Sequence, residues 1–78
     1  MDTKSRRTST TADRIKERMS ELNMKQIDIV KAANIDKGAL SSYISGKYEP
    51  KDKVMFRLAK ALDVDEMWLW GYDVPKER

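Results

Sequence analysis

The 78-residue sequence predicts an all-α fold, a compact bundle of five short helices. Large apolar side chains recur at three- and four-residue spacing, which is the spacing of one helix face. No stretch shows the alternating pattern of a half-buried strand. Residues that favour helix starts or ends stand between the periodic stretches, with connections of only a few residues. A chain this short forms one small domain, which buries about 60% of the surface exposed when it is unfolded.

The first two helices are expected over about residues 12–22 and 25–33. Thr11 is the expected N-cap of the first helix, and Asn23 interrupts it. Asn34 follows the second helix, at a point that requires a residue tolerant of the left-handed conformation. The apolar positions that define these helices are Ala12, Ile15, Met19, Leu22, Ile29, Val30 and Ala33.

Capping and breaking residues also bound the other three helices. Asp36 can accept hydrogen bonds from the first amides of a third helix, which ends at Gly46. Pro50 keeps its predecessor out of the helical region, so a fourth helix is expected over residues 51–62. Asp65 can cap a short fifth helix through Leu69, with Trp68 and Leu69 in the core.

Composition excludes several functional classes. The chain has neither cysteine nor histidine, so disulfides, thiolate metal sites and the commonest general base are absent. Asp63, Asp65 and Glu66 are better explained by helix capping than by calcium binding. We expect no enzymatic activity, cofactor, metal or small-molecule ligand. The absence of a long apolar stretch and of a secretory signal predicts a soluble, cytoplasmic protein.

Charge is unevenly distributed along the chain. The net charge is +3, with 16 basic and 13 acidic residues. Counted along the sequence, residues 1–24 carry +2 (six basic, four acidic), residues 25–57 carry +3 (seven, four) and residues 58–78 carry −2 (three, five). This asymmetry suits a negatively charged partner that one face of the protein meets.

The expected third helix has two different faces. Leu40, Tyr43 and Ile44 share one side of a 3.6-residue period. The other side is small and polar and carries one cation; its residues are Lys37, Gly38, Ser41, Ser42 and Ser45. A helix that enters the DNA major groove needs such a face, because bulky side chains would hold its axis away from the base edges.

From Ile15 to about Pro75 the chain resembles the lambda-repressor-like (XRE-type) helix-turn-helix family, in particular the N-terminal DNA-binding domain of phage and prophage repressors. In that fold the second and third of five helices form the helix-turn-helix. The resemblance rests on Gln26, Ile29, Ala33, Asn34-Ile35-Asp36, Leu40-Ser41, Tyr43, Gly46-Lys47, Pro50, the run 58–62 and the run 68–75.

The resemblance implies a transcriptional repressor that binds a palindromic operator in double-stranded DNA as a homodimer, with the helix Asp36–Ser45 in the major groove. The positions that face bases are then Lys37, Gly38, Ser41 and Ser42. The positions that face phosphates are Lys25, Gln26, Ser45, Lys47, Tyr48 and Lys51. A protein-binding module on the same fold, such as an antitoxin or an anti-repressor partner, is the alternative.

Two further features have open interpretations. Trp70 is a candidate dimer contact, or else packs onto the chain's own C-terminal segment. Residues 1–11 are expected to be a disordered basic tail, whose Lys4, Arg6 and Arg7 either solubilise the protein or reach the duplex as an arm. The helix-turn-helix domain is then residues 12–75, and residues 76–78 begin a linker to a further domain or end the protein.

Overall fold

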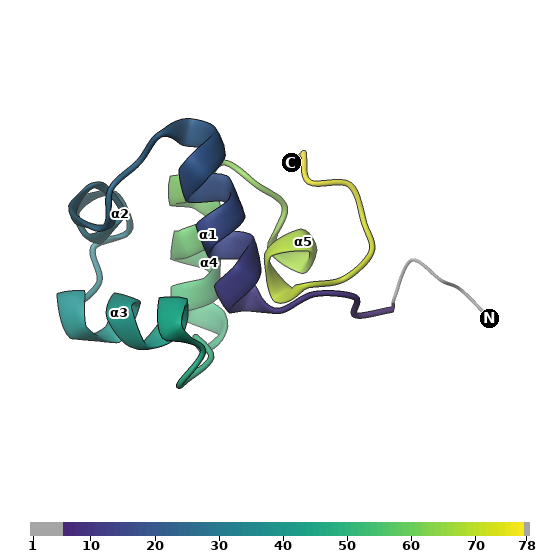
Figure 1. The fold of residues 1–78 in the computed structure, drawn as a ribbon, viewed down its shortest axis with the longest axis horizontal. Coiled ribbons are helices and arrows are strands. Elements are labelled where there is room, and N and C mark those ends of the chain that lie inside the picture. The colour runs from purple at the N-terminus through teal and green to yellow at the C-terminus, as the bar shows by residue number, and fades with distance from the viewer. Residues whose placement is uncertain (1–5, 78) are drawn as a thin grey trace.

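The predicted five-helix order is confirmed in a computed structural model, which describes residues 6–77 (Figure 1). The helices are α1 (Thr11–Leu22), α2 (Gln26–Ala33), α3 (Lys37–Ser45), α4 (Asp52–Leu62) and α5 (Glu66–Trp70). Over the described residues the only β pairing is an isolated antiparallel bridge between Arg7 and Tyr72. In the same region, none of the helices is long and apolar enough to cross a membrane.

The first helix begins one residue earlier than the sequence indicates. Thr10, not Thr11, is the N-cap, and its Oγ1 accepts a hydrogen bond from the Asp13 N–H at 3.1 Å. Thr11 is instead the first helical residue and is only 2% exposed. Both residues are threonines, so the preference for threonine at N-caps does not tell which of them is the cap. In the structure Thr11 is buried within the first turn, and Thr10 is the cap.

Left-handed residues end the helices, as expected for Asn34. Asn23, Asn34 and Asp63 have φ values of 55°, 54° and 56°, and each closes the helix that precedes it. Asparagine and aspartate tolerate this conformation better than other non-glycine residues. Asp63 therefore ends α4, whereas Asp65 begins α5 by accepting hydrogen bonds from the Met67 and Trp68 amides.

One apolar core holds the helices together. α1 packs against α3, α4 and α5, and α2 packs against α3 and α4. Trp68 and Leu69 lie in this core, as expected. The core residues are Ile15, Ile29, Ala33, Leu40, Met55, Leu58, Ala59, Leu62, Val64, Trp68 and Leu69.

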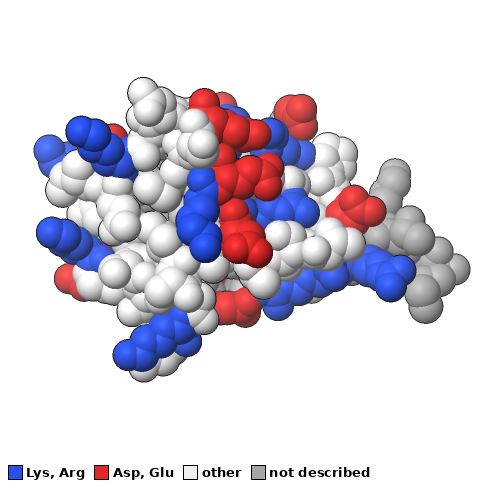
Figure 2. Space-filling view, viewed as in Figure 1, with Lys and Arg blue, Asp and Glu red and all other residues white. Residues whose placement is uncertain are grey.

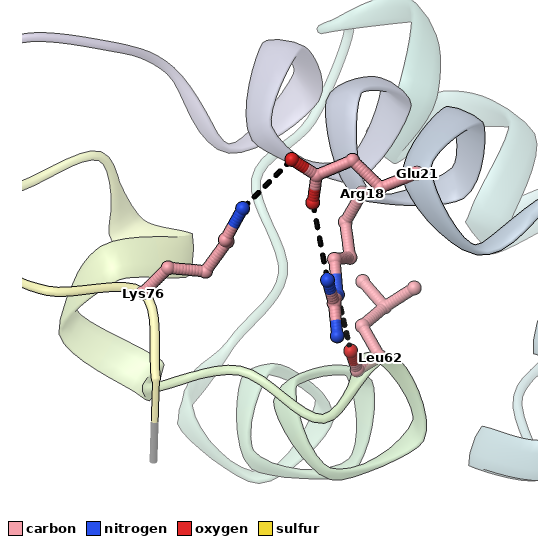
Figure 3. Close-up of polar contacts among 4 residues, drawn as sticks. All are labelled: Arg18, Glu21, Leu62 and Lys76. Atoms are coloured by element: carbon pink, nitrogen blue, oxygen red, sulfur yellow. Dashed lines mark hydrogen bonds and ion pairs between the residues drawn. The ribbon is translucent and has the colours of Figure 1, made fainter.

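The C-terminal segment packs back onto α1 beyond the expected boundary at residue 75. The Lys76 Nζ lies 2.7 Å from Glu21 Oε2, and Arg18 on the same helix bonds both Glu21 and the Leu62 carbonyl oxygen (Figure 3). The Lys76 carbonyl also accepts the Asp65 N–H at 2.8 Å. Lys76 is therefore held against α1 and the start of α5.

The structure also differs from the expected disordered tail. Residues 1–5, including Lys4, lie outside the described residues, but residues 6–10 run beside the turn that follows α5. The Gly71 carbonyl accepts the Thr8 and Ser9 N–H groups at 2.8 and 3.0 Å, and the Asp73 N–H donates to the Arg6 carbonyl at 2.8 Å. Backbone hydrogen bonds hold this segment, so its lack of large apolar side chains was a misleading signal.

Candidate nucleic-acid interface

A tight turn joins α2 to α3, and the start of α3 is fixed by a side-chain cap. Asn34 takes the left-handed conformation, and the Ile35 N–H donates to the Val30 carbonyl at 3.3 Å. The Asp36 Oδ2 then accepts the Gly38 and Ala39 amides at 2.9 and 3.2 Å. These local contacts fix the direction in which α3 leaves the turn.

The two faces of α3 separate as the sequence indicates. Leu40 is fully buried, and Tyr43 and Ile44 are partly buried against the core. On the opposite side Lys37, Gly38 and Ser41 are exposed, and Ser42 is half-buried; all four are the residues expected to face bases. The small size of Gly38, Ser41 and Ser42 leaves the backbone of α3 close to the molecular surface.

Gly38 has a structural role that the sequence did not reveal. A Cβ atom at this position would lie 3.0 Å from the Asp36 Oδ2 that caps the helix. The absence of a side chain therefore leaves room for the capping carboxylate as well as for close approach of a ligand.

The last residue of α3 and the loop after it carry three of the residues expected to face phosphates: Ser45, Lys47 and Tyr48. Ser45 is exposed, but its hydroxyl donates to the Ser42 carbonyl at 3.0 Å and accepts the Lys47 N–H at 3.4 Å. Its proton is therefore already used within the loop. Lys47 is exposed, and its Nζ lies 5.5 Å from the centroid of the Tyr48 ring, which is itself 61% exposed.

α2 and α4 begin differently from the other three helices. Thr10, Asp36 and Asp65 cap α1, α3 and α5 with side-chain oxygens, whereas the N-caps of α2 and α4 are Lys25 and Lys51. A lysine ammonium has no acceptor, so it cannot bond the amides of the first turn. Both of these helices thus begin with a cation, and each also carries a carboxylate in its first turn: Asp52 in α4 and Asp28 in α2, whose Oδ2 accepts the Lys25 N–H at 2.8 Å.

A shallow groove brings some of the predicted site residues together. Gly38 and Ser42 of α3 line it with Tyr48 and Lys51, and Glu49 lines it too. Lys25, Gln26 and Lys47 are exposed but lie outside this groove. The sequence does not mark Glu49 as part of this site, because the residues next to it in the folded protein are distant from it in the chain.

The surface charge is arranged by element. On the face shown in Figure 2, carboxylates form a band over α1 with basic side chains beside it, and further basic side chains lie on the α2 and α3 side and along the N-terminal segment. The acidic residues of α1 are Asp13, Glu17 and Glu21, spaced four residues apart and therefore on one side of the helix. The carboxylate side of α1 therefore disfavours an anionic partner.

Trp70 is half-buried rather than fully exposed. It packs against the core and lines a second groove with the start of α4, whose other lining residues are Pro50, Lys51, Asp52, Lys53 and Val54. The groove leaves part of the indole accessible beside an apolar proline and valine.

These features define a helix-turn-helix domain. A helix-turn-helix family model matches residues 15–69, which is more than half of the chain, and the chain belongs to this family, of the lambda-repressor-like type. It is accordingly a DNA-binding regulator and not an enzyme, as the lack of histidine and cysteine led us to expect. No curated protein sequence matches the chain.

Two solved structures of the P22 c2 repressor are similar to this chain. One is the crystal structure of that repressor in complex with synthetic operator 9T in the presence of Tl+: its TM-score is 0.73 at 26% identity, and the match covers 80% of this chain and 94% of that one. The other is the solution structure of its DNA-binding domain, with a TM-score of 0.77 at 23% identity over 100% of this chain and 96% of that one. The second match shows the fold alone.

Proposed function

We propose that this protein is a transcriptional repressor of the phage or prophage type that reads double-stranded DNA with α3 in the major groove. The observation that carries the proposal is the exposed face of α3, which presents Lys37, Gly38 and Ser41; Gly38 also lines a groove with Tyr48 and Lys51. Small polar groups at the centre and longer donors at the edge suit base edges and phosphates respectively.

The central residues supply the base contacts in this proposal. Lys37 donates to O6 or N7 of a guanine, and the hydroxyls of Ser41 and Ser42 donate or accept at either kind of base pair. Gly38 adds no bulk between the helix axis and the base edges. Lys37 is therefore the strongest determinant of base preference on this helix.

The outer residues supply the phosphate contacts. Lys25 and Gln26 at the start of α2, and Lys51 at the start of α4, place side-chain donors at helix N-termini, where phosphates bind favourably. Lys47 and Tyr48 act from the loop between α3 and α4. Ser45 can donate to a phosphate only after its hydroxyl rotates away from the Ser42 carbonyl, which accepts its proton.

The operator is proposed to be palindromic and to bind two copies of the protein. One copy presents a single recognition helix, and two copies related by two-fold symmetry read half-sites about 34 Å apart along the duplex. The similar P22 c2 repressor has been seen with a synthetic operator, which supports this mode of action. Trp70 and the groove along the start of α4 are the proposed dimer contact.

Equilibrium titration of labelled duplex DNA over a series of salt concentrations tests this function. We expect affinity to fall steeply with salt, because each phosphate contact releases counterions. Lys47→Ala should weaken binding to all sequences alike and lower the salt slope by about one unit. Glu17→Ala on the acidic side of α1 is a control that should not weaken binding. Undetectable or salt-independent binding would overturn the proposal and favour the protein-binding module.

A further inference from the structure

The N-terminal strap, defined as residues 6–10, is fixed by the turn after α5. Its backbone pairs with that turn through the Thr8, Ser9 and Asp73 amides, and the backbones of Arg7 and Tyr72 form an isolated antiparallel β-bridge. The fit depends on Gly71, since a Cβ atom there would lie 2.1 Å from the Ser9 carbonyl oxygen. The backbone of Arg7 is therefore held in one place, and its side chain starts from a defined point.

The Arg7 side chain reaches the loop that follows the recognition helix. Its Nη2 forms an ion pair with Glu49 Oε2, 42 residues away in the sequence. The two side chains are 40% and 50% exposed, so the pair is open to solvent on one side. The strap thus links the turn after α5 with the loop between α3 and α4.

Glu49 occupies an unfavourable place for a DNA interface. It lines the groove that contains Gly38, Ser42 and Lys51, and among the described lining residues it alone is acidic. A carboxylate beside the path of a phosphate backbone repels it, and salt screens such a short-range repulsion only in part. A cation held against the carboxylate removes most of that repulsion.

We propose that Arg7 is a positioning residue of the DNA interface: held by the strap, it binds and neutralises Glu49, so that Lys47 and Lys51 face the phosphate backbone without an opposing carboxylate between them. This inference rests on the proposed DNA binding. It differs from a basic arm that wraps the duplex, because Arg7 acts through Glu49 and need not touch DNA.

A mutant cycle on a labelled duplex of mixed sequence tests the inference. The proteins are the wild type, Arg7→Ala, Glu49→Gln and the double variant. Arg6→Ala is the matched control, since it removes the same charge from the adjacent residue of the strap. We expect Arg7→Ala to weaken binding about two- to fivefold more than Arg6→Ala, the range that an exposed ion pair supports. Arg7→Lys should restore most of the affinity.

The Glu49→Gln background gives the decisive comparison. There the carboxylate is gone, so Arg7→Ala should cost no more affinity than Arg6→Ala does. An equal loss from Arg7→Ala in both backgrounds would mean that Arg7 meets the phosphates itself, and would overturn the inference while the DNA-binding function stands. Failure of the wild type to bind DNA would instead overturn the function and the inference with it.

Discussion

The Asp36 carboxylate and the empty side-chain position of Gly38 form one unit at the start of α3. Asp36 Oδ2 accepts the Gly38 N–H at 2.9 Å, and a Cβ on Gly38 would lie 3.0 Å from that same oxygen. The glycine therefore leaves room for the cap that orients α3. This structural role is separate from any advantage of a small residue in approaching DNA.

Replacing Gly38 with alanine should raise the free energy of unfolding by less than the difference in helix propensity predicts. Gly→Ala within an exposed helix ordinarily gains about 1 kcal/mol. Here the new methyl group presses on the capping carboxylate, so we expect little or no gain in the free energy of unfolding measured with urea.

The same substitution in an Asp36→Ala background is the control. Asp36→Ala alone should cost about 1 kcal/mol through loss of the cap. Gly38→Ala should then recover most of the ordinary gain, because no carboxylate remains to be displaced. An equal gain with and without Asp36 would show that the two residues are independent.

Gly71→Ala should destabilise the protein more than Gly46→Ala. Both glycines have positive φ values, 105° and 82°, so alanine is strained by about 1 kcal/mol at either position. At Gly46 the added methyl group meets only the Ala12 Cβ, at 3.8 Å, whereas at Gly71 it meets the Ser9 carbonyl oxygen at 2.1 Å. We expect a loss of at least about 2 kcal/mol at Gly71 in urea unfolding, and equal losses would contradict the placement of the strap.

Glu21 should make stability depend on pH in the acid range. The hydrogen bond from Lys76, together with that from Arg18, lowers the pKa of Glu21 below the ordinary glutamate value of 4.5. A group whose pKa is lowered by folding stabilises the protein above its unfolded pKa, and that stabilisation is lost as pH falls through the folded pKa.

Urea unfolding of Glu21→Gln over a range of pH checks this contribution. The wild type should be the more stable protein near neutral pH, and the difference should shrink as pH falls below 4.5. Glu17→Gln, one turn earlier on α1, makes the same change of charge and serves as the comparison. A difference between wild type and Glu21→Gln that stays constant with pH would exclude the Lys76–Glu21–Arg18 contact as its source.

Trp70 should govern self-association. We expect sedimentation to show a weak, concentration-dependent dimer, because the half-buried indole borders an apolar groove with Pro50 and Val54. Trp70→Ala should abolish the dimer, with folding checked by circular dichroism. Phe56→Ala, which removes a 48% exposed aromatic elsewhere on α4, should leave it intact. A strict monomer at high concentration would rule out this role.

Local signals in the sequence predicted most of the fold. The spacing of Ile15, Ile29 and Leu40, the cap Asp36 and the turn residue Asn34 each depend on near neighbours in the chain, and all act as expected. Helix starts were less certain where two similar residues adjoin, as with the two threonines at the start of α1.

Contacts between distant residues were not predictable in the same way. The strap is held by backbone groups, so no side-chain pattern marks it, and the Arg7–Glu49 pair joins residues that only the folded chain brings together. The engaged hydroxyl of Ser45 likewise depends on the rotamer it adopts within the loop. The scaffold of the site was therefore readable from sequence, whereas its electrostatic balance required the structure.

The most direct test of the central claim is selection of randomised duplex DNA by the wild type and by Lys37→Ala. The wild type should enrich a two-fold symmetric site, and Lys37→Ala should relax preference at one base pair in each half-site, at a cost of about 1–3 kcal/mol there. Lys47→Ala, selected in parallel, should keep the same site with weaker binding throughout. An unchanged base preference in Lys37→Ala, or enrichment of no site by the wild type, would contradict the reading of DNA by α3.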